Sequence, residues 1–104
     1  MVNKDSSTEK TELSDILAEK ISAAIDNCGA NRLLRWENRK NKRYYELFAG
    51  TDLLGQAFLL RVWGSMKTKQ GGEKREFLDL NEIINKAKDI TKARARHGYE
   101  LVSV

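Results

Sequence analysis

The chain has 104 residues and a formal net charge of +4, and its 33% charged and 40% hydrophobic residues are the balance of a soluble globular protein. This length favours one domain with a single core of modest size. The lone cysteine, Cys28, excludes an internal disulfide and a multi-cysteine metal site, and no apolar stretch approaches the ~20 residues of a membrane span. Because the N-terminus has no apolar run of the signal-peptide type, we expect a cytoplasmic protein with no membrane partner.

The first patterned segment is an amphipathic helix over residues 11–29, after a polar stretch at residues 1–10 that is typical of a disordered tail. Its apolar residues recur at spacings of three and four: Leu13, Ile16, Leu17, Ile21, Ala24, Ile25 and Cys28. We expect the thiol of Cys28 to be buried in this stripe. The stripe can pack on the body of the same chain or on a second copy, and the pattern does not choose between them.

Four strand patterns follow, at residues 33–37, 43–48, 57–63 and 73–77. The third is the strongest, and its alternation places Phe58 on one face and Trp63 on the other. Polar or glycine-bearing segments at residues 38–42, 49–56 and 67–72 read as the connecting turns and loop.

Helical periodicity returns near residue 80, with Asn81 as the expected N-cap and Gly98 as the expected stop. The expected buried face carries Ile83, Ile84, Ala87 and Ile90. Residues 99–104 read as a last strand. Strands in a run followed by a helix predict an α+β fold, an antiparallel sheet covered on one face by the C-terminal helix, with the N-terminal amphipathic helix added.

No set of residues predicts catalysis. His97 is the only histidine and stands at a helix end, where a capping role is typical. The sequence has no second histidine or cysteine to build a metal site, no phosphate-binding glycine motif and no carboxylate pair on an apolar background. We therefore expect no enzymatic activity, no metal and no cofactor.

The basic residues suggest a polyanion as partner, because residues 32–104 carry a net charge of +7 while residues 1–31 carry −3. They form three groups: around the turn at 38–42, around the turn at 67–72 and on the last helix. The second group has Trp63 and Gly64 at its base. An indole can stack on a sugar or a terminal base, and lysines on a turn can neutralise phosphates. Alternatively, Trp63 belongs to the core and the lysines only solvate the hairpin.

Several segments together resemble the WGR domain family, which is named for its Trp-Gly-Arg motif: LLRWEN (33–38), RYYEL, TDLLGQAFLLRVWG, a Lys/Gly turn, REFLDLNEIINKA and a basic helix ending in HGY. The resemblance covers about residues 31–102, so residues 31–104 form the expected WGR-like domain. It implies an antiparallel sheet with a packed helix, and a nucleic-acid-binding module. In the DNA-dependent poly(ADP-ribose) polymerases this domain binds near DNA breaks, close to a terminal 5′ phosphate.

Matched onto this chain, the motif's Trp is Trp63 and its Gly is Gly64, but its Arg position holds Ser65. A serine lacks the planar fork with which an arginine grips a phosphate. The leading hypothesis is a stand-alone bacterial DNA-binding module that contacts a backbone or a duplex end. The expected site residues are Trp63, Gly64, Ser65, Arg43, Arg61, Lys67, Lys69, Lys74 and Arg75. The alternative is a protein-interaction module or homodimer that uses the helix at 11–28, with DNA binding lost at Ser65.

Overall fold

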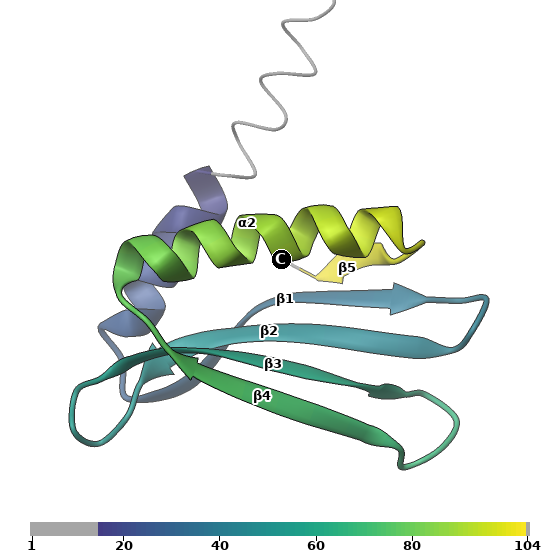
Figure 1. Cartoon of the computed structure of the whole chain (residues 1–104), viewed down its shortest axis with the longest axis horizontal. Helices are drawn as coiled ribbons and strands as arrows, with labels where there is room; N and C mark the ends of the chain where they lie inside the picture. The colour runs from purple at the N-terminus through teal and green to yellow at the C-terminus, as the bar shows by residue number, and fades with distance from the viewer. Residues whose placement is uncertain (1–14, 104) are drawn as a thin grey trace, which may run out of the picture.

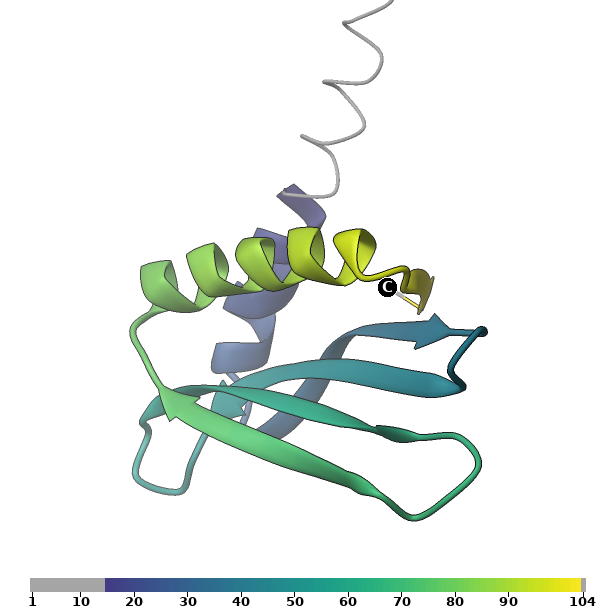
Figure 2. The same ribbon diagram turned by 45° about the vertical axis from the view of Figure 1, so that its right-hand side comes forward.

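The protein is one antiparallel sheet with two helices on the same face, as the computed structural model of the chain shows for residues 15–103 (Figures 1 and 2). The sheet order is β4-β3-β2-β1-β5, and the predicted α+β class is confirmed. The strands are β1 (Gly29–Asn38), β2 (Arg43–Thr51), β3 (Ala57–Ser65), β4 (Gly71–Phe77) and β5 (Glu100–Ser103). Helix α2 (Leu80–Arg96) joins β4 to β5, and a helix over residues 15–25 precedes β1. The expected tail at residues 1–10 lies outside the described range.

The N-terminal helix buries its apolar stripe on the body of its own chain. Its Leu17, Ile21 and Ala24 belong to one core cluster with Ile83 and Ala87 of α2. Lys20 also donates a hydrogen bond from Nζ to the carbonyl oxygen of Leu33, 3.0 Å away. Of the two burial sites that the pattern left open, the structure shows the intramolecular one.

The prediction that this helix continues to residue 29 and buries Cys28 is wrong. The helix ends at residue 25, and the Cys28 thiol is exposed. The segment between the helix and β1 is hydrogen-bonded to the end of β2, where the backbone amide and the hydroxyl of Thr51 both donate to the carbonyl oxygen of Asn27. Gly29, with a φ of +97°, then turns the backbone into β1. These are tertiary contacts that helical periodicity does not report.

Other boundaries also differ from the sequence expectation: β1 begins at Gly29 rather than at residue 33, and β2 runs to Thr51, into the expected loop at 49–56. Gly71 and Gly72 are not in the turn but begin β4, where they pair with Gly64 and Trp63. The N-cap of α2 is Asp79 rather than Asn81, and its carboxylate accepts from the backbone amide of Glu82 at 2.8 Å. The Glu82 carboxylate accepts in return from the Asp79 amide, which completes a capping box.

Strand alternation gives the sheet two distinct faces, as predicted. The helix face carries Tyr45 and Leu59 and lies under both helices, whereas no helix of residues 15–103 covers the open face, which carries Tyr44 and Phe58. Phe58 is nonetheless only 1% exposed. The Phe77 ring meets it edge-on at 6.2 Å, and the guanidinium of Arg75 lies 4.3 Å from the centre of its ring.

Register brings distant turns together at each end of the sheet (Figure 2). At one end, which we call the basic end, the turns at 39–42 and 66–70 adjoin, since the Met66 amide donates to the carbonyl oxygen of Lys42 at 2.7 Å. At the other end, the loop end, the loop at 52–56 lies near the junctions into β1 and α2. The candidate site lies at the basic end.

Candidate nucleic-acid interface

Trp63 lies on the helix face, partly exposed, with its indole against the backbone of the edge strand. Its cross-strand partner is Gly72, where an added Cβ would come within 3.0 Å of the ring. The other side of the indole stacks on Tyr45, with ring centres 6.3 Å apart and planes at 21°. Gly72 therefore makes room for the indole to lie on β4, which the turn interpretation of this glycine did not anticipate.

Gly64 serves the open face in the same way. A Cβ there would come within 2.8–2.9 Å of the ring and hydroxyl of Tyr44, so this aromatic side chain occupies the space that the glycine leaves free. The Trp-Gly pair therefore seats one aromatic ring on each face of the sheet, near the basic end.

Ser65 has a structural role in the turn that follows β3. Its hydroxyl oxygen accepts hydrogen bonds from the backbone amides of Lys67 at 3.1 Å and Thr68 at 3.2 Å. Such serine turns fix the chain direction through a short side chain, which an arginine cannot supply. The residue at the motif's Arg position thus stabilises the hairpin that presents Lys67 and Lys69.

A pocket of about 170 Å³ joins Trp63 to two arginines, Arg43 from β2 and Arg94 from α2. Tyr44, Tyr45, Gly64 and Tyr99 complete its lining. The Arg94 guanidinium lies over two of these rings, 4.4 Å from the centre of Tyr45 and 5.0 Å from that of Tyr99. Within residues 15–103, neither arginine forms an ion pair with a carboxylate, and Nε of Arg94 is buried without a hydrogen-bond partner.

An unpaired, partly desolvated guanidinium is energetically costly unless an anion compensates it. Arg94 was not among the site residues expected from the sequence. Its only signal was its place in the basic last turns of α2, where a helix-dipole role explains a cation equally well. Its position beside Trp63 depends on how α2 docks on the sheet.

The basic end collects two groups of cations that the sequence separates. The turns at 39–42 and 66–70 adjoin there, and they hold no acidic residue. Their exposed basic residues, together with the first residue of β2, are Arg39, Lys40, Lys42, Arg43, Lys67 and Lys69. The end of α2 adds Arg94 and Arg96, so basic residues outnumber the acidic ones at this end, where Glu37 and Glu100 pair across β1 and β5.

The structure does not bring every expected site residue to this end. Arg61 lies on the helix face in an ion pair with Glu76 at 2.8 Å, which Lys86 also joins at 2.6 Å. The hydrogen bond from Lys86 lowers the pKa of Glu76 most, burial opposes it, and the charges of Lys86, Arg61 and Lys74 add to the lowering. Lys74 pairs with Arg61 across the strands, whereas Arg75 lies on the open face over Phe58.

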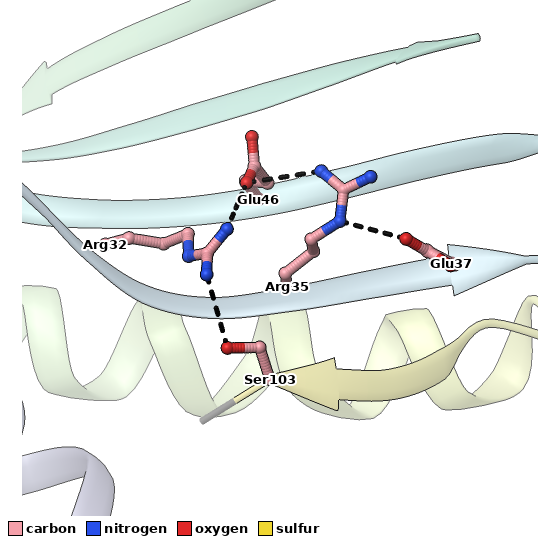
Figure 3. A network of polar contacts seen from close by, with 5 residues as sticks. All are labelled: Arg32, Arg35, Glu37, Glu46 and Ser103. Atoms are coloured by element: carbon pink, nitrogen blue, oxygen red, sulfur yellow. Dashed lines mark hydrogen bonds and ion pairs between the residues drawn. The ribbon is translucent and has the colours of Figure 1, made fainter. Parts of the chain in front are cut away.

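Arg32 and Arg35 of β1 are also neutralised, in a network on the open face (Figure 3). Glu46 accepts from Arg32 at 3.0 Å and forms an ion pair with Arg35 at 3.3 Å, while Arg35 donates to Glu37 at 3.0 Å. Burial lowers the pKa of Arg35, but its hydrogen bonds to Glu37 and Glu46 outweigh this and the pKa is raised. Arg32 also donates to the hydroxyl of Ser103 in β5. This network ties β5 to the sheet.

Comparison with models of known families, with curated proteins and with solved structures gave no match in any of the three. Within residues 15–103, no group of three or more His, Cys, Asp or Glu side chains lies close enough to hold a metal ion. No helix in this range is long and apolar enough to cross a membrane.

Proposed function

We propose that this protein is a non-catalytic, cytoplasmic nucleic-acid-binding module of WGR type, which contacts a DNA backbone or duplex end at its basic end. One observation carries the proposal: Arg43 and Arg94, without carboxylate partners among the described residues, line one pocket with the partly exposed indole of Trp63. The segment resemblance around Trp63 and Gly64 points to the same function.

The chemistry of the pocket suits a phosphodiester. A guanidinium offers several N–H donors in a planar fork that matches two phosphate oxygens. Gly72 and Tyr45 cover the two faces of the Trp63 indole, so its exposed edge, rather than a stacked face, is left to contact the attached sugar. The cations on the two adjoining turns extend the positive surface along a backbone. Such contacts carry no sequence information, so binding is expected to depend on salt rather than on sequence.

Arg43 provides a clean test because its side chain is exposed and its described hydrogen bond is made by the backbone amide, to Asn41. Fluorescence anisotropy of a short blunt duplex, titrated at several salt concentrations, measures affinity and the salt slope. Arg43→Gln should lower the affinity about tenfold or more and reduce the slope of log K against log salt by about 0.9. Lys92→Gln, which removes the same charge from the exposed side of α2, is the control.

The duplex is prepared with 5′-phosphate and with 5′-hydroxyl ends. Tighter binding of the phosphorylated duplex would indicate end recognition, whereas equal, salt-sensitive binding would indicate a general backbone binder. Equal losses in Arg43→Gln and Lys92→Gln would refute the pocket as the site, and no binding at low salt would refute the proposal as a whole.

The alternative, a partner held by the N-terminal helix, has little surface left to use. Leu17, Ile21 and Ala24 are buried against the sheet, and Leu13 lies outside the described residues. Of the large apolar side chains of residues 15–25, Ile16 is the most exposed, at 44%. The replacement of the motif's Arg by Ser65 remains the observation in favour of lost DNA binding, and the anisotropy titration decides between the two.

A further inference from the structure

The loop end carries an apolar surface that the proposed function does not use. Leu53 and Leu54, in the loop between β2 and β3, are 93% and 86% exposed. Phe77, which ends β4 and pairs with Phe58 of β3, is 53% exposed. Isolated exposed leucines are ordinary, but adjacent large apolar side chains grouped at one end of a small domain are typical of an interaction site.

The loop holds these leucines outward in a defined conformation. The Asp52 carboxylate accepts from the backbone amides of Leu54 at 2.9 Å and Gln56 at 2.8 Å. The Asp52 amide donates to the carbonyl of Gln56 at 3.0 Å, and Gly55, with a φ of +80°, donates to the carbonyl of Asp52 at 3.0 Å. Four hydrogen bonds across five residues preorganise the loop, so the exposure of the leucines does not come from an unstructured segment.

A shallow hollow of about 420 Å³ lies directly beside the leucines. The two leucines form one wall, Cys28 and the start of β1 form another, and Phe58 and Arg75 also line it. A protruding apolar side chain and a hollow able to receive one therefore occur on the same patch.

The same patch also carries charges of both signs. The Arg75 guanidinium lies over Phe58 and forms no ion pair within residues 15–103. Among the described contacts, only Oδ1 of Asp52 accepts hydrogen bonds, which leaves Oδ2 for a further donor. A two-fold interface uses the same patch on both copies, so each projection or charge needs its counterpart on that patch, and this surface carries both members of each pair.

We propose that a second copy of this chain docks on the loop end, in a two-fold dimer. Leu53 and Leu54 of each copy enter the hollow of the other, and Arg75 of each copy meets Asp52 of the other. The two basic ends then point away from the interface, so this proposal does not depend on the proposed function.

Sedimentation velocity of the full chain, from low micromolar to near-millimolar concentration, tests the dimer. The wild type should change from monomer to dimer over this range, and Leu53→Asp with Leu54→Asp should raise the dissociation constant at least tenfold per leucine. Met66→Asp is the matched control, since Met66 is 41% exposed at the opposite end of the sheet. Circular dichroism checks that each variant keeps its fold.

A wild type that stays monomeric at every concentration overturns the proposal, and so does a Met66→Asp variant that weakens the dimer as much as the leucine changes. Arg75→Gln should weaken the dimer several-fold and make it less sensitive to salt, because it removes the charge pair.

Cys28 supplies a probe in the wall of the hollow, because it is the only cysteine of the chain and is exposed. A nitroxide attached there, on a sample that sedimentation shows to be dimeric, should give a dipolar distance between the two copies. The coupling should disappear in the double leucine variant. A dimer whose labels show no coupling would place the interface elsewhere and overturn the assignment.

Discussion

Replacement of Arg94 by methionine tests two effects of its positive charge separately: the effect on the stability of the fold and the effect on affinity for nucleic acid. The Arg94 guanidinium lies over the Tyr45 and Tyr99 rings, with Nε buried and without a hydrogen-bond partner among the described residues. Methionine keeps the unbranched stem and removes the charge. If the guanidinium is there for an anion, the variant should remain stable while it loses affinity.

The free-energy terms nearly cancel in the unbound protein. The two cation–π contacts are worth about 0.5–1 kcal/mol each at partly exposed sites. Against this, the buried Nε–H without an acceptor costs about 1–3 kcal/mol, which the methionine removes. The free energy of unfolding of Arg94→Met should therefore lie within about 1 kcal/mol of the wild-type value. In the complex the variant lacks a charge-assisted contact of about 1.5–3 kcal/mol, so affinity should fall about tenfold to a hundredfold.

Urea unfolding followed by tryptophan fluorescence measures the first quantity, and duplex anisotropy over a salt series measures the second. The salt slope should fall by about 0.9 for the lost phosphate contact. The reasoning would be refuted by a loss of stability beyond about 2 kcal/mol together with unchanged affinity. That result would mean that the charge of Arg94 holds the aromatic cluster together and has no ligand.

Three further predictions concern other parts of the molecule. Gly50→Ala should cost about 3 kcal/mol or more by urea unfolding, because its Cβ would overlap the carbonyl oxygen of Gly29, whereas an unchanged midpoint would contradict this packing. Because Lys86 lowers the pKa of Glu76, this carboxylate stabilises the fold above its ordinary pKa of about 4.5 and loses that effect as pH falls further. Between neutral pH and acid pH, the free energy of unfolding of Glu76→Gln should fall by about 0.5–1 kcal/mol less than that of the wild type. If the two proteins lose the same free energy of unfolding over this pH range, the prediction is contradicted. Ser65→Arg should cost about 1 kcal/mol through the lost turn bonds yet steepen the salt slope of duplex binding by about 0.9; an unchanged slope would argue against a phosphate at the motif position.

The two ends of the sheet divide the chemistry of the protein between them. The basic end joins two turns that β2 and β3 separate along the chain, whereas the loop end gathers apolar side chains around a hydrogen-bonded loop. A nucleic acid at one end and a second copy at the other would give a bivalent particle, whose apparent affinity for long duplexes exceeds that of a single copy.

The sequence by itself determined the elements and the faces that they bury. Alternation in residues 57–63 placed Trp63 and Phe58 on opposite faces. Helical spacing identified Ile83, Ala87 and Ile90 as the core side of α2, whereas Ile84, also expected there, is only partly buried. These patterns are local, because the side-chain periods of strands and helices are properties of the backbone. Local patterns therefore also sufficed for the α+β class.

Only the tertiary structure decided which residues meet. Cys28 is exposed because Thr51 holds the neighbouring Asn27 by a hydrogen bond. The indole of Trp63 packs on Gly72 because the register of β3 with β4 pairs these two residues. The pocket that joins Arg94 to Trp63 depends on how α2 docks, which no local period encodes. Contacts between segments far apart in the chain are set by strand register and helix packing, and a single sequence contains no direct record of either.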